Sequence, residues 1–292
     1  MKEIIECDVC SNRCRLSGGQ AGKCLARKCE NGKIIPTSYG ILSAIALDPI
    51  EKKPLYRFMP GRMILSVGGF GCNLKCPFCQ NHEISQIKAE NAENRVEFVG
   101  NNSTSHPYRS MNPEEITDLA IHLRDTNKNI GIAFTYNEPL VDYEYVRDTA
   151  KLCKKYDLKT VLVSNGNVSI RVLKEVEPYI DAMNIDLKGF TQESYEKLGG
   201  NLKMVMEFIE MAAKSTHIEI TSLIVPGIND SLDDMEKEAK WISNIRKDIP
   251  LHITRFFPRY KMLNDDPTQI NLMKEMKAVS EKYLEYVYLG NV

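Results

Sequence analysis

Apolar and polar positions alternate in a repeating pattern from residue 62 to the end of the chain. Short apolar runs bounded by polar residues or glycine predict buried strands, and the segments between them carry the apolar spacing of amphipathic helices. The predicted strands are 62–67, 131–134, 160–163, 182–185, 218–224, 252–256 and 286–289. The predicted helices are 143–156, 170–176, 192–197, 202–214, 232–246 and 267–283, preceded by one that starts at Asn112-Pro113-Glu114-Glu115.

Strands separated by helices indicate a parallel sheet with right-handed crossovers. The predicted fold class is therefore α/β, a partial (β/α)6 barrel, whose chemistry we expect at the carboxyl ends of the strands. We expect a cysteine-rich N-terminal segment at 1–31, a connecting region with short strands at 32–61, and the core barrel at 62–292. The polar stretch 89–111 is expected to be a loop that either covers the site or lies plainly on the surface.

Composition narrows the class further. The 292 residues suffice for one barrel and an appended segment, and a hydrophobic content of 43% with 26% charged residues is that of an ordinary globular protein. A formal net charge of -1 gives no overall basic footprint for nucleic acid. The first six residues are too charged for a signal peptide and no apolar run approaches membrane-spanning length, which predicts a cytoplasmic protein. In that compartment nine cysteines favour metal ligation over disulfides.

Three of these cysteines, Cys72, Cys76 and Cys79, lie in one loop directly after the first predicted barrel strand. Two thiols so close could form a redox pair or half of a zinc site. Three without a fourth at matching spacing favour a metal centre that is left one protein ligand short, and an open coordination position is reactive.

A second group of thiols, Cys7, Cys10, Cys14 and Cys24, lies near the start of the chain with glycines between its members. Four thiols at this spacing suit a structural Zn²⁺ or a second iron–sulfur cluster, and a segment without bound metal is the remaining alternative. Cys29 lies outside the spacing and is interpreted as a spare thiol. Because so short a segment cannot build its own core, either a metal or docking on the barrel must stabilise it.

The spacing Cys-x-x-x-Cys-x-x-Cys, with the aromatic Phe78 before the last cysteine, resembles the signature of the radical S-adenosylmethionine (radical SAM) enzymes. The resemblance implies a [4Fe-4S] cluster on Cys72, Cys76 and Cys79, with SAM chelating the fourth iron. It implies an oxidoreductase-type enzyme that cleaves SAM to a 5′-deoxyadenosyl radical, with electrons supplied by a donor of the flavodoxin or ferredoxin type. A zinc knuckle that borrows a distant ligand is the structural alternative.

Nearly the whole chain resembles the AmmeMemoRadiSam-type enzymes, which are related to the pyruvate formate-lyase activating enzymes. The N-terminal cysteines and Cys79-Gln80-Asn81 carry this likeness. It implies either a glycyl residue of a partner protein as substrate or a pathway shared with Memo-like and AMMECR-like proteins. Relatives usually continue past a Tyr-x-Gly-Asn sequence into a further Cys-x-x-Cys, whereas this sequence stops at Val292. If that tail normally contributes metal ligands, the zinc hypothesis for the N-terminal thiols is weaker.

The resemblance also assigns roles to residues that follow the second predicted strand, 131–134. A Gly-Gly-Glu element binds the SAM amino group at this place in the superfamily, and here Tyr136 and Asn137 replace its glycines. Glu138 remains, and a carboxylate beside an ammonium is reasonable chemistry. Glu138 and Asn137 are therefore expected to bind SAM, and Phe78 is expected to contact the cofactor.

Polar residues end the next strands as well. Ser164 and Asn165 are expected to bond ribose hydroxyls, and Asp186 with Lys188 is expected to position the SAM carboxylate, although Lys188 could be a plain surface charge. The loop 225–230 is expected to pack on adenine, to cap the next helix with Asp230 or Asn229, or both. The aromatic and cationic residues of 252–261 suit a peptide or carboxylate substrate.

We therefore predict a radical SAM enzyme in which Glu138, Asn165 and Asp186 hold SAM. One alternative is modification of tRNA bases, which would favour a basic stripe that the sequence lacks. The other is a non-catalytic metal or redox sensor that uses the N-terminal thiols. Cys153 has its simplest interpretation as a core residue, and His252 is interpreted either as part of the substrate-facing group at 252–261 or as a satisfied core residue.

Overall fold

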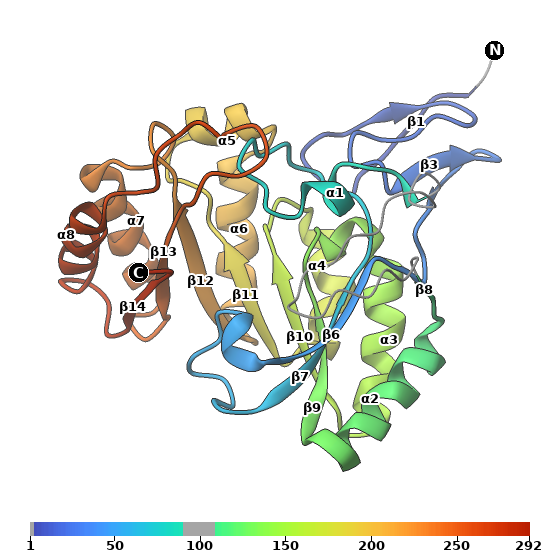
Figure 1. The fold of residues 1–292 in the computed structure, drawn as a ribbon. Helices are drawn as coiled ribbons and strands as arrows, with labels where there is room; N and C mark the ends of the chain where they lie inside the picture. Colours follow the sequence, from blue (N-terminus) through green and yellow to red (C-terminus); the bar gives the residue numbers. More distant parts are fainter. Residues whose placement is uncertain (1–2, 90–108) are drawn as a thin grey trace.

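The computed structural model describes residues 3–89 and 109–292. Its centre is a single sheet of eight strands, covered by helices on its outer side (Figure 1). The strands are β6 (Ala44–Pro49), β7 (Met63–Gly68), β9 (Asn129–Phe134), β10 (Lys159–Ser164), β11 (Ala182–Asp186), β12 (His217–Ile224), β13 (Leu251–Arg255) and β14 (Val287–Gly290). They lie in the order β14-β13-β12-β11-β10-β9-β7-β6, where β6 is antiparallel to β7 and the other neighbours are parallel.

The connections between parallel strands contain helices at every place that the apolar spacing predicted, and one short helix after the cysteine loop that was not predicted. The helices are α1 (His82–Ser85), α2 (Pro113–Asn127), α3 (Tyr143–Lys155), α4 (Ile170–Val176), α5 (Gln192–Leu198), α6 (Leu202–Ala212), α7 (Leu232–Ile245) and α8 (Ile270–Ser280). Asn112 caps α2 in a reciprocal capping box with Glu115, as the start signal indicated. The predicted α/β fold class is confirmed.

The two faces of the sheet are buried against different partners. Leu65, Ile132 and Leu162 belong to the main core, which includes the outer helices. Ile64 and Ala133, on the opposite face, pack in a separate apolar group inside the barrel. Burial on both faces explains why the strands appear in the sequence as continuous apolar runs.

The loop between β6 and β7 closes the inside of the barrel near the amino ends of β12 and β13. Ile50 and Leu55 from this loop pack in the inner apolar group. Glu219 of β12 is fully buried and accepts hydrogen bonds from the backbone N–H groups of Tyr56 (3.0 Å) and Arg57 (2.8 Å). His252 also contacts its carboxylate at 2.6 Å, which confirms the interpretation of His252 as a satisfied core residue.

Glu219→Gln is expected to lower stability at neutral pH and to flatten the acid limb of unfolding. Burial alone would raise the pKa of Glu219, but hydrogen bonds from His217, His252 and the loop backbone lower it to about 2 from 4.5. A depressed carboxyl pKa stabilises the fold above pH 4.5, and this contribution, about 3 kcal/mol, is lost as pH falls from 4.5 to 2. Urea unfolding at pH 7, 4 and 3 measures it. Glu193→Gln, at an exposed helix position, is the matched control, and parallel pH profiles for wild type and Glu219→Gln would refute the assignment.

The N-terminal segment docks on the barrel beside its upper loops (Figure 1). It contains two short antiparallel pairs, β1 (Ile5–Glu6) with β2 (Arg15–Leu16) and β3 (Arg27–Glu30) with β4 (Lys33–Pro36). The buried Arg27 guanidinium forms two hydrogen bonds to Glu144 of α3, at 2.8 and 2.6 Å. Docking on the barrel thus stabilises the N-terminal segment. It is one of the two means of stabilisation, with a bound metal, that were expected for so short a segment.

The region 32–61 contributes directly to the barrel sheet through β6. A further short strand in it, β5 (Ile41–Leu42), pairs with β8 (Arg109–Ser110). Most of the predicted loop 89–111, including Asn101 to Ser105, lies outside the described residues. Within the described residues no helix is both long and apolar enough to cross a membrane.

Candidate active site

The loop that carries Cys72, Cys76 and Cys79 leaves the carboxyl end of β7 through a tight turn. Gly71 has a φ of +81°, and a Cβ atom there would lie 2.3 Å from the carbonyl oxygen of Cys24. Only glycine permits both this left-handed conformation and this close approach. The backbone N–H of Cys72 then donates to the same Cys24 carbonyl at 3.1 Å. The N-terminal segment is therefore one wall of the thiol loop.

The three thiols share an apolar environment. Cys76 and Phe78 are buried with Leu74, Val225 and Phe256, and Cys72 and Cys79 pack against this group. Burial raises the pKa of the Cys72 thiol well above its usual value and that of Cys76 to about 11. Thiolates are thus costly here unless a cation replaces the proton, as it does when iron binds.

Asn137 holds the backbone that leads into the thiol loop. Its Oδ1 accepts from the N–H of Gly69 at 3.0 Å, and its Nδ2 donates to the carbonyls of Phe70 and Gly71, both at 3.1 Å. Asn81, just after the last cysteine, donates to the carbonyl of Tyr136 at 2.7 Å. The loop after β9 and the thiol loop are thus fixed to each other by side-chain amides.

Glu138 is buried at the carboxyl end of β9, next to the ends of β10 and β7. Its Oε1 accepts from Leu140 N–H (3.0 Å) and Ser164 Oγ (2.8 Å), and its Oε2 accepts from Asn165 N–H (2.8 Å). Burial raises the pKa of Glu138 to about 7, although these hydrogen bonds oppose the shift. Asn165 in turn points its Nδ2 at Cys72 Sγ, 3.7 Å away, which connects the carboxylate to the thiol loop.

Asp186 and Lys188 lie on the other side of the thiols. Lys188 Nζ is 3.1 Å from Asp186 Oδ2, and both charges act on Cys76, where the lysine lowers and the aspartate raises the thiol pKa. The Lys188 side chain is only 17% exposed, which excludes its interpretation as a plain surface charge. The ends of three adjacent strands, β9, β10 and β11, thus bring five polar residues toward the thiols that follow β7: Glu138, Ser164, Asn165, Asp186 and Lys188.

The loop after β12 packs on the same apolar group but differs from the prediction at its end. Val225 is buried near the thiols, and Ile228 packs against it. Ser231 caps α7 by accepting from Asp234 N–H, so the prediction of Asp230 or Asn229 as cap is wrong. Asn229 instead closes the loop by accepting from Val225 N–H at 2.7 Å. The Asn229 side chain is therefore not free to cap α7, because its amide oxygen is already engaged within the loop.

The segment after β13 covers part of the thiol loop. Tyr260 stacks on His82 with ring centroids 4.2 Å apart, and Lys261 N–H donates to the Pro77 carbonyl at 2.9 Å. Of the predicted rings, Phe256 packs in the apolar group that contains Cys76, and Lys261 contacts the thiol loop through its backbone.

Two asparagines were missed by sequence reasoning. Asn73 accepts from Asn165 Nδ2 at 2.8 Å and donates to the Asn167 carbonyl at 2.8 Å. Asn12, in the N-terminal segment, donates to the Asn73 carbonyl at 2.8 Å. The location of Asn73 between Cys72 and Cys76 was the one sequence feature that could have indicated its role. Nothing in the sequence indicates the partner of Asn12.

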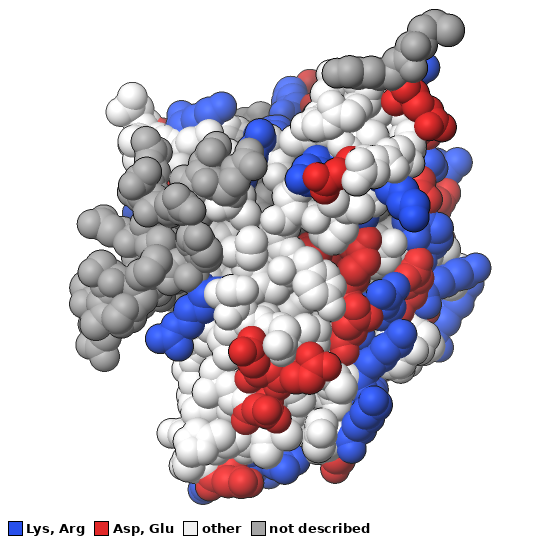
Figure 2. All heavy atoms as spheres, turned by 90° about the vertical axis from the view of Figure 1, so that its right-hand side faces the viewer, with Lys and Arg blue, Asp and Glu red and all other residues white. Residues whose placement is uncertain are grey.

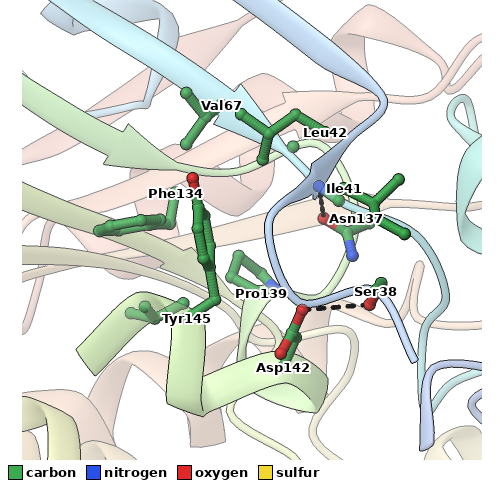
Figure 3. Close-up of a pocket in the computed structure, with 12 residues that line it drawn as sticks. Ser38, Ile41, Leu42, Val67, Phe134, Asn137, Pro139, Asp142 and Tyr145 are labelled. Carbon is green, nitrogen blue, oxygen red and sulfur yellow. Dashed lines mark hydrogen bonds between the residues drawn. The ribbon is translucent and has the colours of Figure 1, made fainter. Parts of the chain in front are cut away.

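A small cavity of ≈ 20 Å³ lies behind Asn137, on the helix-covered side of the sheet (Figure 3). Phe134, Val67 and Tyr145 form much of its lining, and Asp142 accepts a hydrogen bond from Ser38 at its edge. Its size suits about one water molecule. It is separate from the thiol site.

The donor set fits an iron–sulfur cluster with an open iron. In residues 3–89 and 109–292, no three or more histidine, cysteine or carboxylate side chains are arranged to hold a single metal ion. In a [4Fe-4S] cluster each thiolate binds its own iron, so the sulfurs need not converge on one point. Three thiols in an apolar loop at the carboxyl edge of a parallel α/β barrel are typical of barrel enzymes that bind an iron–sulfur cluster.

The chain belongs to the radical SAM superfamily, whose family model matches residues 66–242. Over 99% of its length it is 35% identical to an uncharacterised protein of Methanocaldococcus jannaschii, MJ0808, of which it covers 81%. It is 25% identical to the pyruvate formate-lyase-activating enzyme of Clostridium pasteurianum, over 74% of this chain and 87% of that enzyme.

The fold is similar to that of QueE from Escherichia coli, with a TM-score of 0.54 and 13% identity. The likeness covers 86% of this chain and 93% of that one. These comparisons confirm the recognition of a radical SAM protein related to the activating enzymes. Membership implies a [4Fe-4S] cluster and SAM as cofactors.

Proposed function

We propose that this protein is a radical SAM enzyme whose cluster is held by Cys72, Cys76 and Cys79. When bound, such a cluster would supply the one electron that breaks the S–C5′ bond of SAM, giving methionine and a 5′-deoxyadenosyl radical able to take a hydrogen atom from the substrate. The observation that carries the proposal is the hydrogen-bonded chain from Glu138 through Asn165 to Cys72, which brings a carboxylate beside the thiol loop.

The chain's own residues divide the work of binding SAM. Glu138 would supply negative charge for the ammonium, and it fixes the turn at Ser164 and Asn165, whose polar groups would bind the ribose hydroxyls. Asp186 and Lys188 flank Cys76 from the other side, where the lysine suits the carboxylate of SAM. Asn137 acts through the backbone, because its amide is engaged with the thiol loop.

For the substrate, the likeness to the pyruvate formate-lyase-activating enzyme favours a glycyl residue of a partner protein as the hydrogen donor. A donor of the flavodoxin or ferredoxin type would supply the electron. Incubation with SAM and a candidate partner whose glycines carry deuterium tests this. Transfer of deuterium into 5′-deoxyadenosine would support a glycyl residue as the substrate. Cleavage of SAM without deuterium transfer from any glycine would refute it.

The tRNA alternative is the less supported one. On the face drawn in Figure 2, acidic and basic side chains lie side by side, consistent with a net charge of -1. This pattern differs from the basic stripe that a polyanion attracts.

Electron paramagnetic resonance of the anaerobically reconstituted, reduced protein tests the proposed function. A [4Fe-4S]⁺ signal that changes on addition of SAM is expected, because SAM binds the open iron. A signal that ignores SAM would refute radical chemistry at this loop and favour the sensor alternative, in which loss of Cys7 or Cys10 matters more than loss of Cys76.

A further inference from the structure

Cys7, Cys10, Cys14 and Cys24, here the thiol quartet, occupy one place in the docked N-terminal segment. Cys7, Cys10 and Cys24 are each 7% exposed. A Cβ atom on Gly22 would lie 3.6 Å from Cys14 Sγ and 3.7 Å from Cys24 Sγ, so both sulfurs lie on the same side of this glycine. None of the four is in a disulfide.

Hydrogen-bond donors lie beside two of the quartet sulfurs. Lys23 N–H donates to Cys14 Sγ at 3.4 Å, and Asn12 Nδ2 donates to Cys10 Sγ at 3.7 Å. Cys72 has the same arrangement, with Leu74 N–H 3.4 Å from its Sγ. Such donors favour the anionic thiolate, which is the form that binds metals.

Without a cation the quartet is an unfavourable arrangement for thiolates. Three of the four sulfurs are buried, and Cys14 and Cys24 lie beside the same glycine, so thiolates here would be desolvated and would repel one another. A bound metal cation would neutralise the thiolates and remove this repulsion. The hydrogen-bond donors beside the sulfurs are consistent with such a site.

Cys29 shows what an ordinary buried thiol looks like in the same segment. It is 1% exposed on β3, pairs with Ile34 of β4 and lies outside the spacing of the quartet. It is therefore a suitable buried thiol for comparison with the four.

The quartet is attached to the proposed SAM-cleaving loop at two points. The Cys24 carbonyl accepts from Cys72 N–H at 3.1 Å and is the atom that Gly71 approaches most closely. Asn12 Nδ2 donates to the Asn73 carbonyl at 2.8 Å and lies 3.7 Å from Cys10 Sγ. A metal bound by the quartet would therefore fix the backbone atoms that contact Cys72 and Asn73 of the thiol loop.

We propose that the thiol quartet is a second metal centre, which takes a thiophilic metal as Zn²⁺ or as an iron–sulfur cluster and braces the Gly71–Asn73 backbone. The sulfurs in the described chain are not gathered around a single ion, and the same is true of Cys72, Cys76 and Cys79. Zinc would therefore require rotation of cysteine side chains, whereas a polynuclear cluster would bind sulfurs that stand further apart. The centre is distinct from the proposed SAM cluster and does not depend on its chemistry.

Metal analysis of the full-length, anaerobically purified and reconstituted protein tests this. Cys10→Ala and Cys14→Ala are expected to lose one zinc, or the iron of one cluster, per chain, while the SAM-responsive resonance signal of the other cluster persists in weakened form. Cys29→Ala is the matched control and keeps the full metal content. Loss of zinc identifies a zinc site and loss of iron identifies a second cluster.

Two results would overturn the proposal. One is a metal content in Cys10→Ala and Cys14→Ala equal to that of Cys29→Ala. The other, which needs no variant, is alkylation of all four quartet thiols in the native protein at the same rate before and after a chelator is added. Cys76→Ala separates this proposal from the proposed function, since it should remove the SAM-responsive signal and leave the quartet metal in place.

Discussion

Cys76→Ala is expected to abolish formation of 5′-deoxyadenosine and to remove the SAM-responsive iron. Two thiolates cannot replace three in holding a cluster whose fourth iron must stay open. Of Cys72, Cys76 and Cys79, Cys76 is the one that is buried, with Asp186 and Lys188 beside it. Product formation in an oxygen-free assay with reductant should fall to the level of a protein-free reaction. Iron analysis of the same sample measures the cluster.

Cys153→Ala is the control for this experiment. Cys153 is fully buried on α3, in the main core, where it packs with apolar neighbours. Its removal should lower stability by about 1 kcal/mol and leave iron and product unchanged. If Cys76→Ala still makes 5′-deoxyadenosine under these conditions, the thiols of this loop do not hold the SAM-cleaving cluster.

The barrel was predictable because its signals are local. Each parallel strand is buried on both faces and therefore apolar throughout, and each crossover helix shows its own spacing, so 160–163 and 170–176 could be assigned without reference to each other. The place of the antiparallel strand β6 in the sheet was harder to predict. Its membership of the barrel sheet depends on pairing with β7, for example Ala46 with Ser66, which no local pattern shows.

The site was predictable in composition but not in its connections. Residues at the carboxyl ends of adjacent strands must meet, so Glu138, Asn165 and Asp186 could be placed near the thiols from topology alone. The role of Asn137 as a backbone clamp and the contact from Asn12 to Asn73 are long-range hydrogen bonds. Their partners are separated by tens of residues, and only the folded chain determines them.

Glu138→Gln is expected to retain the cluster but to weaken SAM binding about 100-fold, which corresponds to about 3 kcal/mol. The carboxylate accepts from three donors, and a glutamine of the same shape must point its NH₂ group at one of them. The substitution also removes the negative charge proposed to face the ammonium of SAM. Equilibrium binding of SAM to the reconstituted variant, with iron content measured in parallel, gives both quantities.

Glu238→Gln provides a matched comparison because Glu238 is equally enclosed but lies on α7, away from the thiols. It is 2% exposed, accepts a hydrogen bond from Ser222, and burial raises its pKa to about 8, close to the value of about 7 for Glu138. The two substitutions thus remove a similar buried carboxyl group, and their common effect on stability cancels in the comparison. A large loss of SAM affinity in Glu138→Gln alone supports a role at the cofactor. Equal affinity in the two variants would mean that Glu138 is a structural residue of the β9–β10 edge, and that the SAM ammonium is bound by other groups.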